Sequence, residues 1–315
     1  MRIAFLTNSI LATESIAYLH STGLLKAIGT LERNTLLRSQ LEAFATQNNL
    51  EYALFTKQSL EANLNDFLRK ANIDLAIVQT FPYKIPASSL QIPKIGFYNV
   101  HPGPLPQYRG PDPVFWVLKN QEQAGAITLH KMEEDYDTGA IVLCESISIH
   151  PTDTYGILNS HLAHAAPVLI NKFLELLASP SPVPLVEQSA REAGYQQKPT
   201  VESLMIDWTR DTSLDIQALT QASNPNQNGS IAFFRDVITR FLEVDVLTPE
   251  FSANLSPGTV LTADESRGLQ VKCIDKQVIR LNIVHVDEGY FTGKRFAEVF
   301  NIKIGEKFTP PSFLS

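Results

Sequence analysis

Short apolar runs alternate with helical patterns through the first half of the chain. The apolar runs predict strands at Ile3–Leu6, Leu25–Gly29, Tyr52–Phe55, Leu75–Gln79, Ile95–Val100, Ile127–Lys131 and Ile141–Ile147. The helical patterns between them lie at Ala12–Leu19, Thr35–Asn48, Leu60–Ala71, Pro113–Lys119 and Thr154–Leu177. This strand–helix–strand alternation predicts an α/β domain with a mostly parallel sheet that helices cover on both faces.

The pattern changes after about residue 178. Pro180, Pro182 and Pro184 cannot continue a helix, because proline lacks the amide donor and clashes with the preceding turn. Beyond them the sequence predicts one helix and then short strands, at Ser213–Ala222, Ser230–Phe234, Val237–Val246, Gly258–Ala263, Leu269–Lys272 and Val278–Val286. Strands of this length and spacing favour a small β-barrel. We therefore predict a first domain at 1–180, a linker at 181–200 and a second domain at 201–315.

Composition and charge narrow the functional classes. With 315 residues, of which 44% are hydrophobic, the chain can fill two cores. The net charge is −7, and neither half has the basic balance that is usual in nucleic-acid binders. No apolar run reaches the roughly 18 residues of a membrane span, and Met1–Thr7 has the pattern of a strand rather than of a signal peptide. Two distant cysteines, Cys144 and Cys273, are consistent with a reducing compartment, so we expect a cytoplasmic protein.

The candidate chemistry lies in the stretch 97–110 and in a second loop. Asn99 and His101 are two residues apart at the end of a predicted strand, so their side chains point to the same face. The Pro/Gly-rich loop that follows places them at the carboxyl edge of the sheet, where open α/β sheets bind ligands. Asp137, in the second loop, is well placed to join them. An amide, an imidazole and a carboxylate together can polarise a carbonyl group and move a proton.

These residues also have structural interpretations. His101 alone could pack in the core, and Asp137 belongs to an ordinary turn sequence, Asp-Thr-Gly; their combination favours catalysis. Arg109 either locks its loop through a salt bridge, which we favour, or touches an anionic acceptor. We interpret His130 as a residue that packs within the sheet.

Several classes of site are disfavoured. No glycine fingerprint follows the first strand, so a dinucleotide site is not expected, and neither a Walker sequence nor a Gly-x-Ser-x-Gly elbow occurs. His161 and His164 have helical spacing, but no third ligand lies near them in the sequence. We expect no metal. The basic residues Lys294, Arg295, Lys303 and Lys307 are interpreted as a solvated face.

Three motifs, in this order and spacing, resemble the signature of the folate-dependent formyltransferases: Asn99-Val100-His101-Pro102, Leu105-Pro106-x-Tyr108-Arg109-Gly110 and Asp137-Thr138-Gly139. That family includes methionyl-tRNA formyltransferase, glycinamide ribonucleotide formyltransferase and the amino-sugar N-formyltransferases. The resemblance covers nearly all of 1–180 and implies a Rossmann-like formyltransferase domain. The second half resembles, more weakly, a C-terminal domain of the family, a small barrel with an oligonucleotide-binding-like (OB-like) fold, through Ile206-Asp207-Trp208, Ser223-Asn224-Pro225 and Pro257-Gly258-Thr259-Val260.

The resemblance implies 10-formyltetrahydrofolate as the donor and a primary amine as the acceptor. Asn99 would donate to the oxyanion that amine attack creates, protonated His101 would stabilise the same charge, and Asp137 would favour the imidazolium and take the amine proton. By the same resemblance the pterin lies beside Phe81, Pro82, Tyr83, Glu134, Asp135 and Tyr136. We assign Pro102, Gly103 and Arg109 to the acceptor side.

The sequence departs from the tRNA enzyme in two segments. That enzyme resembles this chain in the core but carries a basic insertion after the second strand, where this chain has the short, barely basic segment Thr30–Leu36. The segment Gln79–Pro86 also differs from the Gly-containing loop of the tRNA enzyme. Because affinity for tRNA is mainly phosphate electrostatics, we predict a small-molecule amine acceptor, an amino sugar or an amino-acid derivative.

Two alternatives remain open. The first is methionyl-tRNA formylation. The second is hydrolysis of formyltetrahydrofolate, or folate binding without catalysis. The role of the second domain is also open; an exposed barrel face would allow a homodimer, and no membrane partner is expected.

Overall fold

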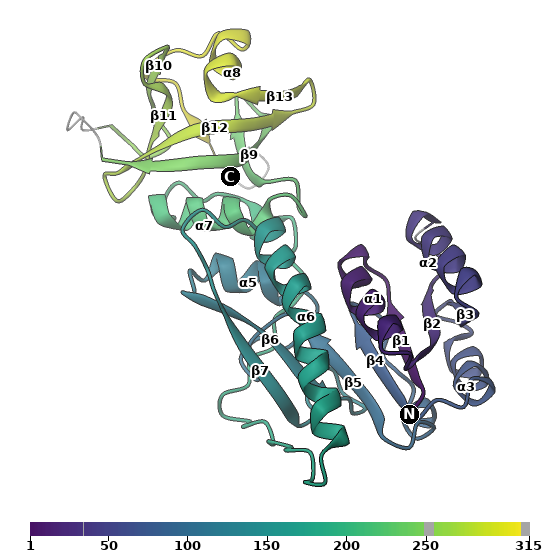
Figure 1. The fold of residues 1–315 in the computed structure, drawn as a ribbon. Helices are drawn as coiled ribbons and strands as arrows, with labels where there is room; N and C mark the ends of the chain where they lie inside the picture. Colours follow the sequence, from purple (N-terminus) through teal and green to yellow (C-terminus); the bar gives the residue numbers. More distant parts are fainter. Residues whose placement is uncertain (34, 249–254, 310–315) are drawn as a thin grey trace. The chain divides into compact units, whose positions relative to one another are not determined.

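The computed structural model describes residues 1–33, 35–248 and 255–309, so Asn34 of the segment Thr30–Leu36 lies outside the described residues. The chain forms two compact units (Figure 1). The first unit comprises Met1–Pro113, Ala124–Ser148 and Asn159–Gln197, and the second comprises Val114–Gln123, Ile149–Leu158 and Lys198–Ser315. The division of the chain at 180 and 200 stays a prediction.

The first unit is built on a seven-stranded sheet with the order β3-β2-β1-β4-β5-β6-β7. Its strands are β1 (Ile3–Thr7), β2 (Leu25–Leu31), β3 (Glu51–Phe55), β4 (Leu75–Gln79), β5 (Gly96–His101), β6 (Ala124–Lys131) and β7 (Ile141–Ser148). β1 to β5 pair in parallel, whereas β6 and β7 pair antiparallel. The mostly parallel, Rossmann-like sheet expected from the sequence is therefore confirmed.

Helices precede or follow the strands much as the apolar pattern predicts. They are α1 (Thr13–Ser21), α2 (Thr35–Gln47), α3 (Leu60–Lys70), α4 (Ala87–Leu90), α5 (Pro113–Lys119) and α6 (Tyr155–Ala178), with a short 3-10 turn, η1 (Ile10–Ala12). Residues 32–34 alone separate β2 from α2, so the connection is too short to hold an inserted loop.

Helices cover both faces of this sheet. Neighbouring residues on a strand point to opposite faces, and β5 shows where each face is packed. Phe97 joins the apolar cluster that includes Leu64 and Phe67 of α3. Tyr98 instead packs against Phe173 of α6, with 4.5 Å between ring centroids. The buried sheet therefore presents its polar strand ends, rather than a face, to ligands.

The carboxyl ends of β1 and β4 lie side by side where the strand order reverses. β2 and β3 follow on one side of β1, and the chain then returns to place β4 and β5 on its other side, which makes this edge a topological switch point. Thr7 and Thr80 join these ends through their hydroxyl groups, 3.2 Å apart, and the main-chain N–H of Asn8 donates to Thr80 O. The loops that leave β1 and β4 therefore start from a fixed edge.

The segment 186–196, inside the predicted linker, packs onto the first unit. Val186 and Ile141 exchange two main-chain hydrogen bonds, of 2.8 and 2.9 Å. Farther along, Arg109 N donates to Gly194 O, and Gln196 N donates to Arg109 O. The segment thus runs beside the loop after β5 like an additional short strand.

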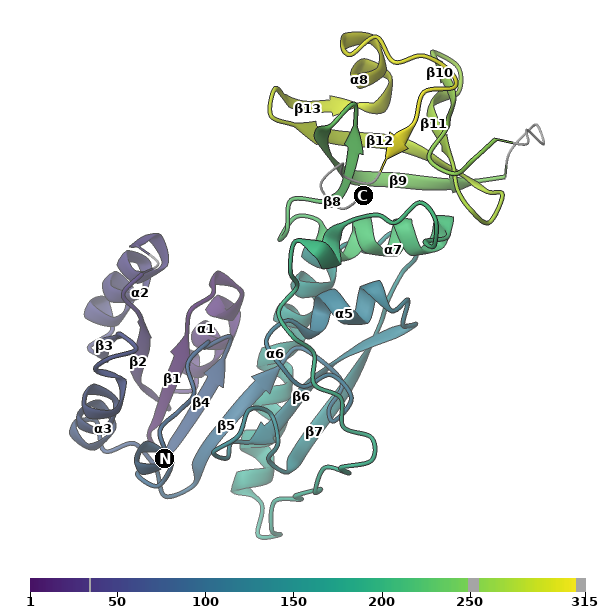
Figure 2. The same cartoon turned by 180° about the vertical axis from the view of Figure 1, so that it is seen from behind.

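The second unit contains an antiparallel sheet with the order β10-β11-β12-β9-β8-β14 (Figures 1 and 2). Its strands are β8 (Ser230–Phe234), β9 (Val237–Leu247), β10 (Val260–Asp264), β11 (Gly268–Lys272), β12 (Val278–Val286), β13 (Gly289–Thr292) and β14 (Phe308–Thr309). A bridge between Thr259 and Lys307 joins the two ends of this order. The predicted barrel-like domain is therefore confirmed.

Helices accompany this barrel. α7 (Ser213–Ser223) begins at a capping box formed by Thr212 and Asp215, and a 3-10 turn, η2 (Glu202–Leu204), precedes it. Three elements of this unit, β13, β14 and α8 (Gly293–Val299), were not predicted from the sequence. In the described part of both units, no helix combines the length and apolarity needed to cross a membrane.

Burial of α6 against β5 predicts a stability effect. Phe173 has no exposed surface, so Phe173→Ala should lower the free energy of unfolding by about 3–5 kcal/mol, through lost burial and a residual cavity. Urea denaturation would measure this. Val168 on the same helix is 56% exposed, so Val168→Ala should change stability by less than about 0.5 kcal/mol. Equal effects of the two substitutions would contradict the packing described.

Candidate active site

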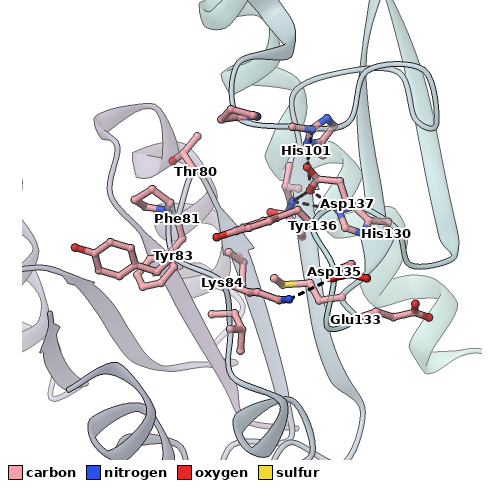
Figure 3. Close-up of a pocket in the computed structure, with 18 of the residues that line it drawn as sticks. Thr80, Phe81, Tyr83, Lys84, His101, His130, Glu133, Asp135, Tyr136 and Asp137 are labelled. Atoms are coloured by element: carbon pink, nitrogen blue, oxygen red, sulfur yellow. Dashed lines mark hydrogen bonds and ion pairs between the residues drawn. The ribbon is translucent and has the colours of Figure 1, made fainter. Parts of the chain in front are cut away.

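A cavity of about 430 Å³ lies at the carboxyl ends of β4 and β5 (Figure 3). One wall is the loop after β4, and the opposite wall is the loop between β6 and β7. The polar side chains Asn99, His101, His130 and Asp137 line one end of it. The structure therefore brings together the three residues that the sequence analysis selected, and adds a fourth.

Strand register explains why Asn99 and His130 are neighbours. The antiparallel pairing of β5 with β6 places these two residues directly opposite each other. Asn99 Nδ2 is 3.2 Å from His130 Nε2 and donates to Asp137 Oδ1 at 3.3 Å. His101 follows two residues later on the same strand, 3% exposed.

Asp137 reaches these residues from a turn with an unusual backbone. Its φ of 55° lies in the left-handed region, which few non-glycine residues adopt. Oδ2 accepts a hydrogen bond of 3.0 Å from Gly110 N. Oδ1 lies 3.6 Å from His101 Nδ1 and 3.5 Å from His130 Nε2. The carboxylate is thus enclosed by two imidazoles, one amide and one main-chain N–H.

Hydrogen bonds to main-chain carbonyls fix the tautomers of both histidines. His101 Nε2 is 2.7 Å from Tyr108 O, and His130 Nδ1 is 2.9 Å from Lys131 O. A carbonyl oxygen only accepts, so each of these nitrogens carries the hydrogen. In the neutral rings the other nitrogen, with its lone pair, faces Asp137. The cluster is therefore arranged to take up a proton, since protonating either ring creates an ion pair.

Burial and charge act in opposite directions on this cluster. Burial lowers the pKa of His101, and the charge of Asp137 partly opposes this shift. Burial also raises the pKa of Asp137, but the two histidines and Gly110 N–H outweigh it and hold that pKa at about 2. At neutral pH the site therefore combines an ionised carboxylate with a neutral His101.

All six residues predicted to lie beside the pterin line the cavity: Phe81, Pro82, Tyr83, Glu134, Asp135 and Tyr136. In Figure 3 Tyr136 extends across the cavity from the side of Asp137 toward the side of Phe81. An ion pair of 3.2 Å between Lys84 and Asp135 also joins the two walls. Among the described residues, no group of three or more His, Cys, Asp or Glu side chains could hold a metal ion.

Only one of the three residues assigned to the acceptor side lines the cavity. Pro102 lines the cavity, but Gly103 and Arg109 do not. A Cβ on Gly103 would lie 2.7 Å from Pro113 and 3.2 Å from His101 Nε2, so glycine lets the loop pass close to the imidazole. Arg109 Nε donates a hydrogen bond of 2.9 Å to Gln188 Oε1, and among the described residues it forms no salt bridge of the kind expected.

Three residues of this region were not predicted from the sequence. His130 was interpreted as a residue that packs within the sheet, whereas its Nε2 faces Asp137. Gln188 and Tyr195 were placed in a linker, yet Gln188 hydrogen-bonds the turn of Asp137 and Tyr195 lines the cavity. The alignment of β5 with β6 would have revealed His130; no local pattern indicates the other two.

The buried, neutral His101 predicts a dependence of stability on pH. Its folded-state pKa is lowered below the ordinary 6.5, so protonation favours the unfolded chain. The contribution of His101 to the free energy of unfolding is fully present above pH 6.5, and it is lost as the pH falls below that value. Between about pH 7.5 and pH 5, the wild type should therefore lose more stability than His101→Gln in urea denaturation.

The matched control is His161→Gln, on an exposed histidine of α6. This variant should keep the pH dependence of the wild type. Parallel curves for the wild type and His101→Gln would show that His101 does not lose stability on protonation.

Comparison with known proteins places this geometry in a family. The family described as "Formyl transferase" matches residues 29–174. The methionyl-tRNA formyltransferase of Dictyoglomus thermophilum is 28% identical over 275 residues, which make up 87% of this chain and 86% of that protein.

Solved structures share the fold. An N-formyltransferase from Helicobacter canadensis, in complex with folinic acid and dTDP-3-aminofucose, has a TM-score of 0.65 at 15% identity, covering 89% of this chain and 99% of that one. HypX from Aquifex aeolicus, in complex with tetrahydrofolic acid, has a TM-score of 0.63 at 19% identity and covers 98% of this chain. The chain spans about half the length of HypX, 48%. Residues 29–174 thus match the formyl transferase family, and most of the chain shares the fold of solved formyltransferases.

Proposed function

We propose that this enzyme transfers the formyl group of 10-formyltetrahydrofolate to the primary amine of a small metabolite, an amino sugar or an amino-acid derivative. The observation that carries the chemistry is the enclosed carboxylate of Asp137, with an imidazole nitrogen of His101 3.6 Å away and the amide of Asn99 3.3 Å away. Transfer to an amine requires a proton acceptor and a donor to the carbonyl oxygen, and this cluster supplies both.

The reaction begins when the amine nitrogen attacks the formyl carbon. A C–N bond forms, the carbonyl oxygen becomes an oxyanion, and the amine acquires a positive charge. His101 Nδ1 takes the surplus proton, because its lone pair faces the ionised Asp137, which stabilises the imidazolium. Burial favours the neutral ring, so in this proposal His101 starts as a proton acceptor and not as the protonated stabiliser expected from the resemblance.

Asn99 stabilises the oxyanion in this scheme. Its amide nitrogen already faces His130 and Asp137, and we assign one of these N–H groups to the formyl oxygen once the donor is bound. When the oxyanion collapses, the bond between the formyl carbon and N10 breaks. The imidazolium then returns its proton to N10, and tetrahydrofolate leaves with charges balanced.

The donor is assigned to the cavity between the two loops. The pterin lies between the wall at Phe81, Pro82 and Tyr83 and the wall at Glu134, Asp135 and Tyr136, all of which line the space. The cluster around Asp137 forms one end of that space, so a formyl group at that end would reach the amide and the imidazole.

Charge favours a small acceptor. The net charge of the chain is −7, and residues 199–315 carry 11 lysines and arginines against 15 acidic residues. In the second unit Lys294 pairs with Glu265 at 2.7 Å and Arg295 with Glu298 at 3.1 Å, so these cations are already partnered. With residues 32–34 as the whole connection between β2 and α2, the chain offers little positive charge to nucleic-acid phosphates.

The second candidate function is formylation of methionyl-tRNA. The curated relative from Dictyoglomus thermophilum carries that name and matches 87% of this chain. Hydrolysis of the donor is a third outcome, because water needs the same oxyanion stabilisation as an amine.

The acceptor can be tested with purified protein and 10-formyltetrahydrofolate. One arm contains charged initiator tRNA, a second a panel of nucleotide-linked amino sugars and amino acids, and a third no amine. Release of tetrahydrofolate and the formylated product are measured together. We expect product in the second arm. Product in the tRNA arm alone would contradict the small-molecule proposal, and tetrahydrofolate release without any amide product would indicate a hydrolase.

The oxyanion assignment predicts the effect of Asn99→Ala. Loss of one preorganised donor should lower kcat by about 10²–10³-fold, while the KM for the donor changes little, since the walls of the cavity are intact. His164→Gln, on an exposed histidine, is the matched control and should retain wild-type kcat. An Asn99→Ala enzyme with kcat near that of the wild type would exclude Asn99 from the reaction.

A further inference from the structure

Gln188 uses every polar atom of its side chain on two loops of the candidate active site. Nε2 donates to Asp137 O at 2.9 Å and to Gly139 O at 2.7 Å. Oε1 accepts from Arg109 Nε at 2.9 Å. One amide group thus ties the turn that carries Asp137 to the loop that follows β5 and His101.

From these contacts we infer that Gln188 is a positioning residue for formyl transfer. It acts through Asp137, by fixing the turn 137–139 against the loop of Arg109. This inference rests on the proposed function of the Asn99, His101 and Asp137 cluster. It extends that function to the segment 186–196, which lies in the region predicted to be a linker.

The turn 137–139 needs these hydrogen bonds because its backbone conformation is unfavourable. Asp137 has a φ of 55°, a conformation that costs free energy in residues other than glycine. Gly139 also lies close to β6, since a Cβ there would be 2.0 Å from Lys131 O. Two carbonyl groups of this turn point toward Gln188, and its amide satisfies both. Without these hydrogen bonds the turn would be free to relax.

The other contacts of the turn do not replace those of Gln188. Thr138 Oγ1 donates to Asp135 O at 3.2 Å, which is a bond within the same loop. Gly110 N donates to Asp137 Oδ2 at 3.0 Å, and it holds the carboxylate but not the backbone. Val186 fixes Ile141 through main-chain bonds, beyond the turn. Among the described residues, Gln188 is therefore the side chain that hydrogen-bonds the main-chain carbonyl of Asp137.

Movement of the turn would change the electrostatics of the cluster. The titratable groups that face Asp137 are His101 on β5, His130 on β6 and the neighbouring Tyr136. The charge of Asp137 raises the pKa of His101 against the effect of burial. If the carboxylate shifts away, the pKa of His101 should fall, and the pKa of Asp137 should rise from about 2.

The test compares Gln188→Met with Gln188→Glu and with Glu187→Ala. Methionine keeps the length of the side chain but makes no comparable hydrogen bonds. Glutamate keeps an acceptor for Arg109 but loses the donor to Asp137 O and Gly139 O. Glu187 is exposed beside Gln188, so Glu187→Ala controls for general effects on the segment.

Three readouts separate positioning from a merely structural role. We expect Gln188→Met and Gln188→Glu to lower kcat by about 10–100-fold, the scale of a misplaced catalytic group, with the KM for the donor near that of the wild type. For Gln188→Met, the limb of the pH–rate profile that reports His101 should move to lower pH. Glu187→Ala should match the wild type in all three readouts.

A different result would overturn the inference: if Gln188→Met lowers the rate equally at all pH values and the His101 limb of the pH–rate profile stays at the wild-type pH, Gln188 contributes to folding alone. Wild-type kcat in Gln188→Glu would also overturn it, because contact with Arg109 would then suffice.

A titration of the free protein keeps this test independent of the proposed function. NMR of carboxyl-labelled aspartate should show the pKa of Asp137 at about 2 in the wild type and higher in Gln188→Met. An unchanged value would contradict the positioning role. Failure of the wild type to formylate any acceptor, with the expected shift still present, would instead contradict the proposed function.

Discussion

The structure depends on how one buried carboxylate is held. Asp137, with a side chain 11% exposed, is surrounded by His101, His130, the amide of Asn99 and the N–H of Gly110. Removing such a group from water is costly unless its charge is compensated. Each imidazole has already given one N–H to a main-chain carbonyl. What remains on His101 is a nitrogen lone pair beside an anion, whose charge raises the pKa of the ring against the larger effect of burial.

The sheet and its loops bring the residues around Asp137 together. β5 presents Asn99 and His101 from one face, and β6 brings His130 opposite Asn99. The turn of Asp137 arrives from beyond β6 with a strained backbone, and Gln188 holds its two carbonyl groups. Segments distant in sequence therefore meet at one edge of the sheet, next to the cavity that we assign to the donor.

Much of this could be predicted from sequence, because it rests on local periodicity. Asn99 and His101 share a face by strand geometry. The apolar runs marked the strands from Ile3 to Ser148 within two residues, except that β6 begins three residues earlier than predicted, at Ala124. His130 was missed because its role depends on the pairing of β5 with β6, which no local pattern specifies. Gln188 was missed for a similar reason, since a proline-rich start made its segment resemble a linker. β13 and β14, of four and two residues, have patterns too short to be distinguished from turns.

The central claim is that His101 and Asp137 act as one proton-accepting unit in formyl transfer. A double-mutant cycle on kcat for formyl transfer, with His101→Ala, Asp137→Asn and the double variant, tests it most directly. Residues that act as a unit are strongly non-additive. The account predicts that the double variant is about as slow as the slower single variant. If the two effects instead multiply, His101 and Asp137 contribute independently, and the proposed unit is wrong.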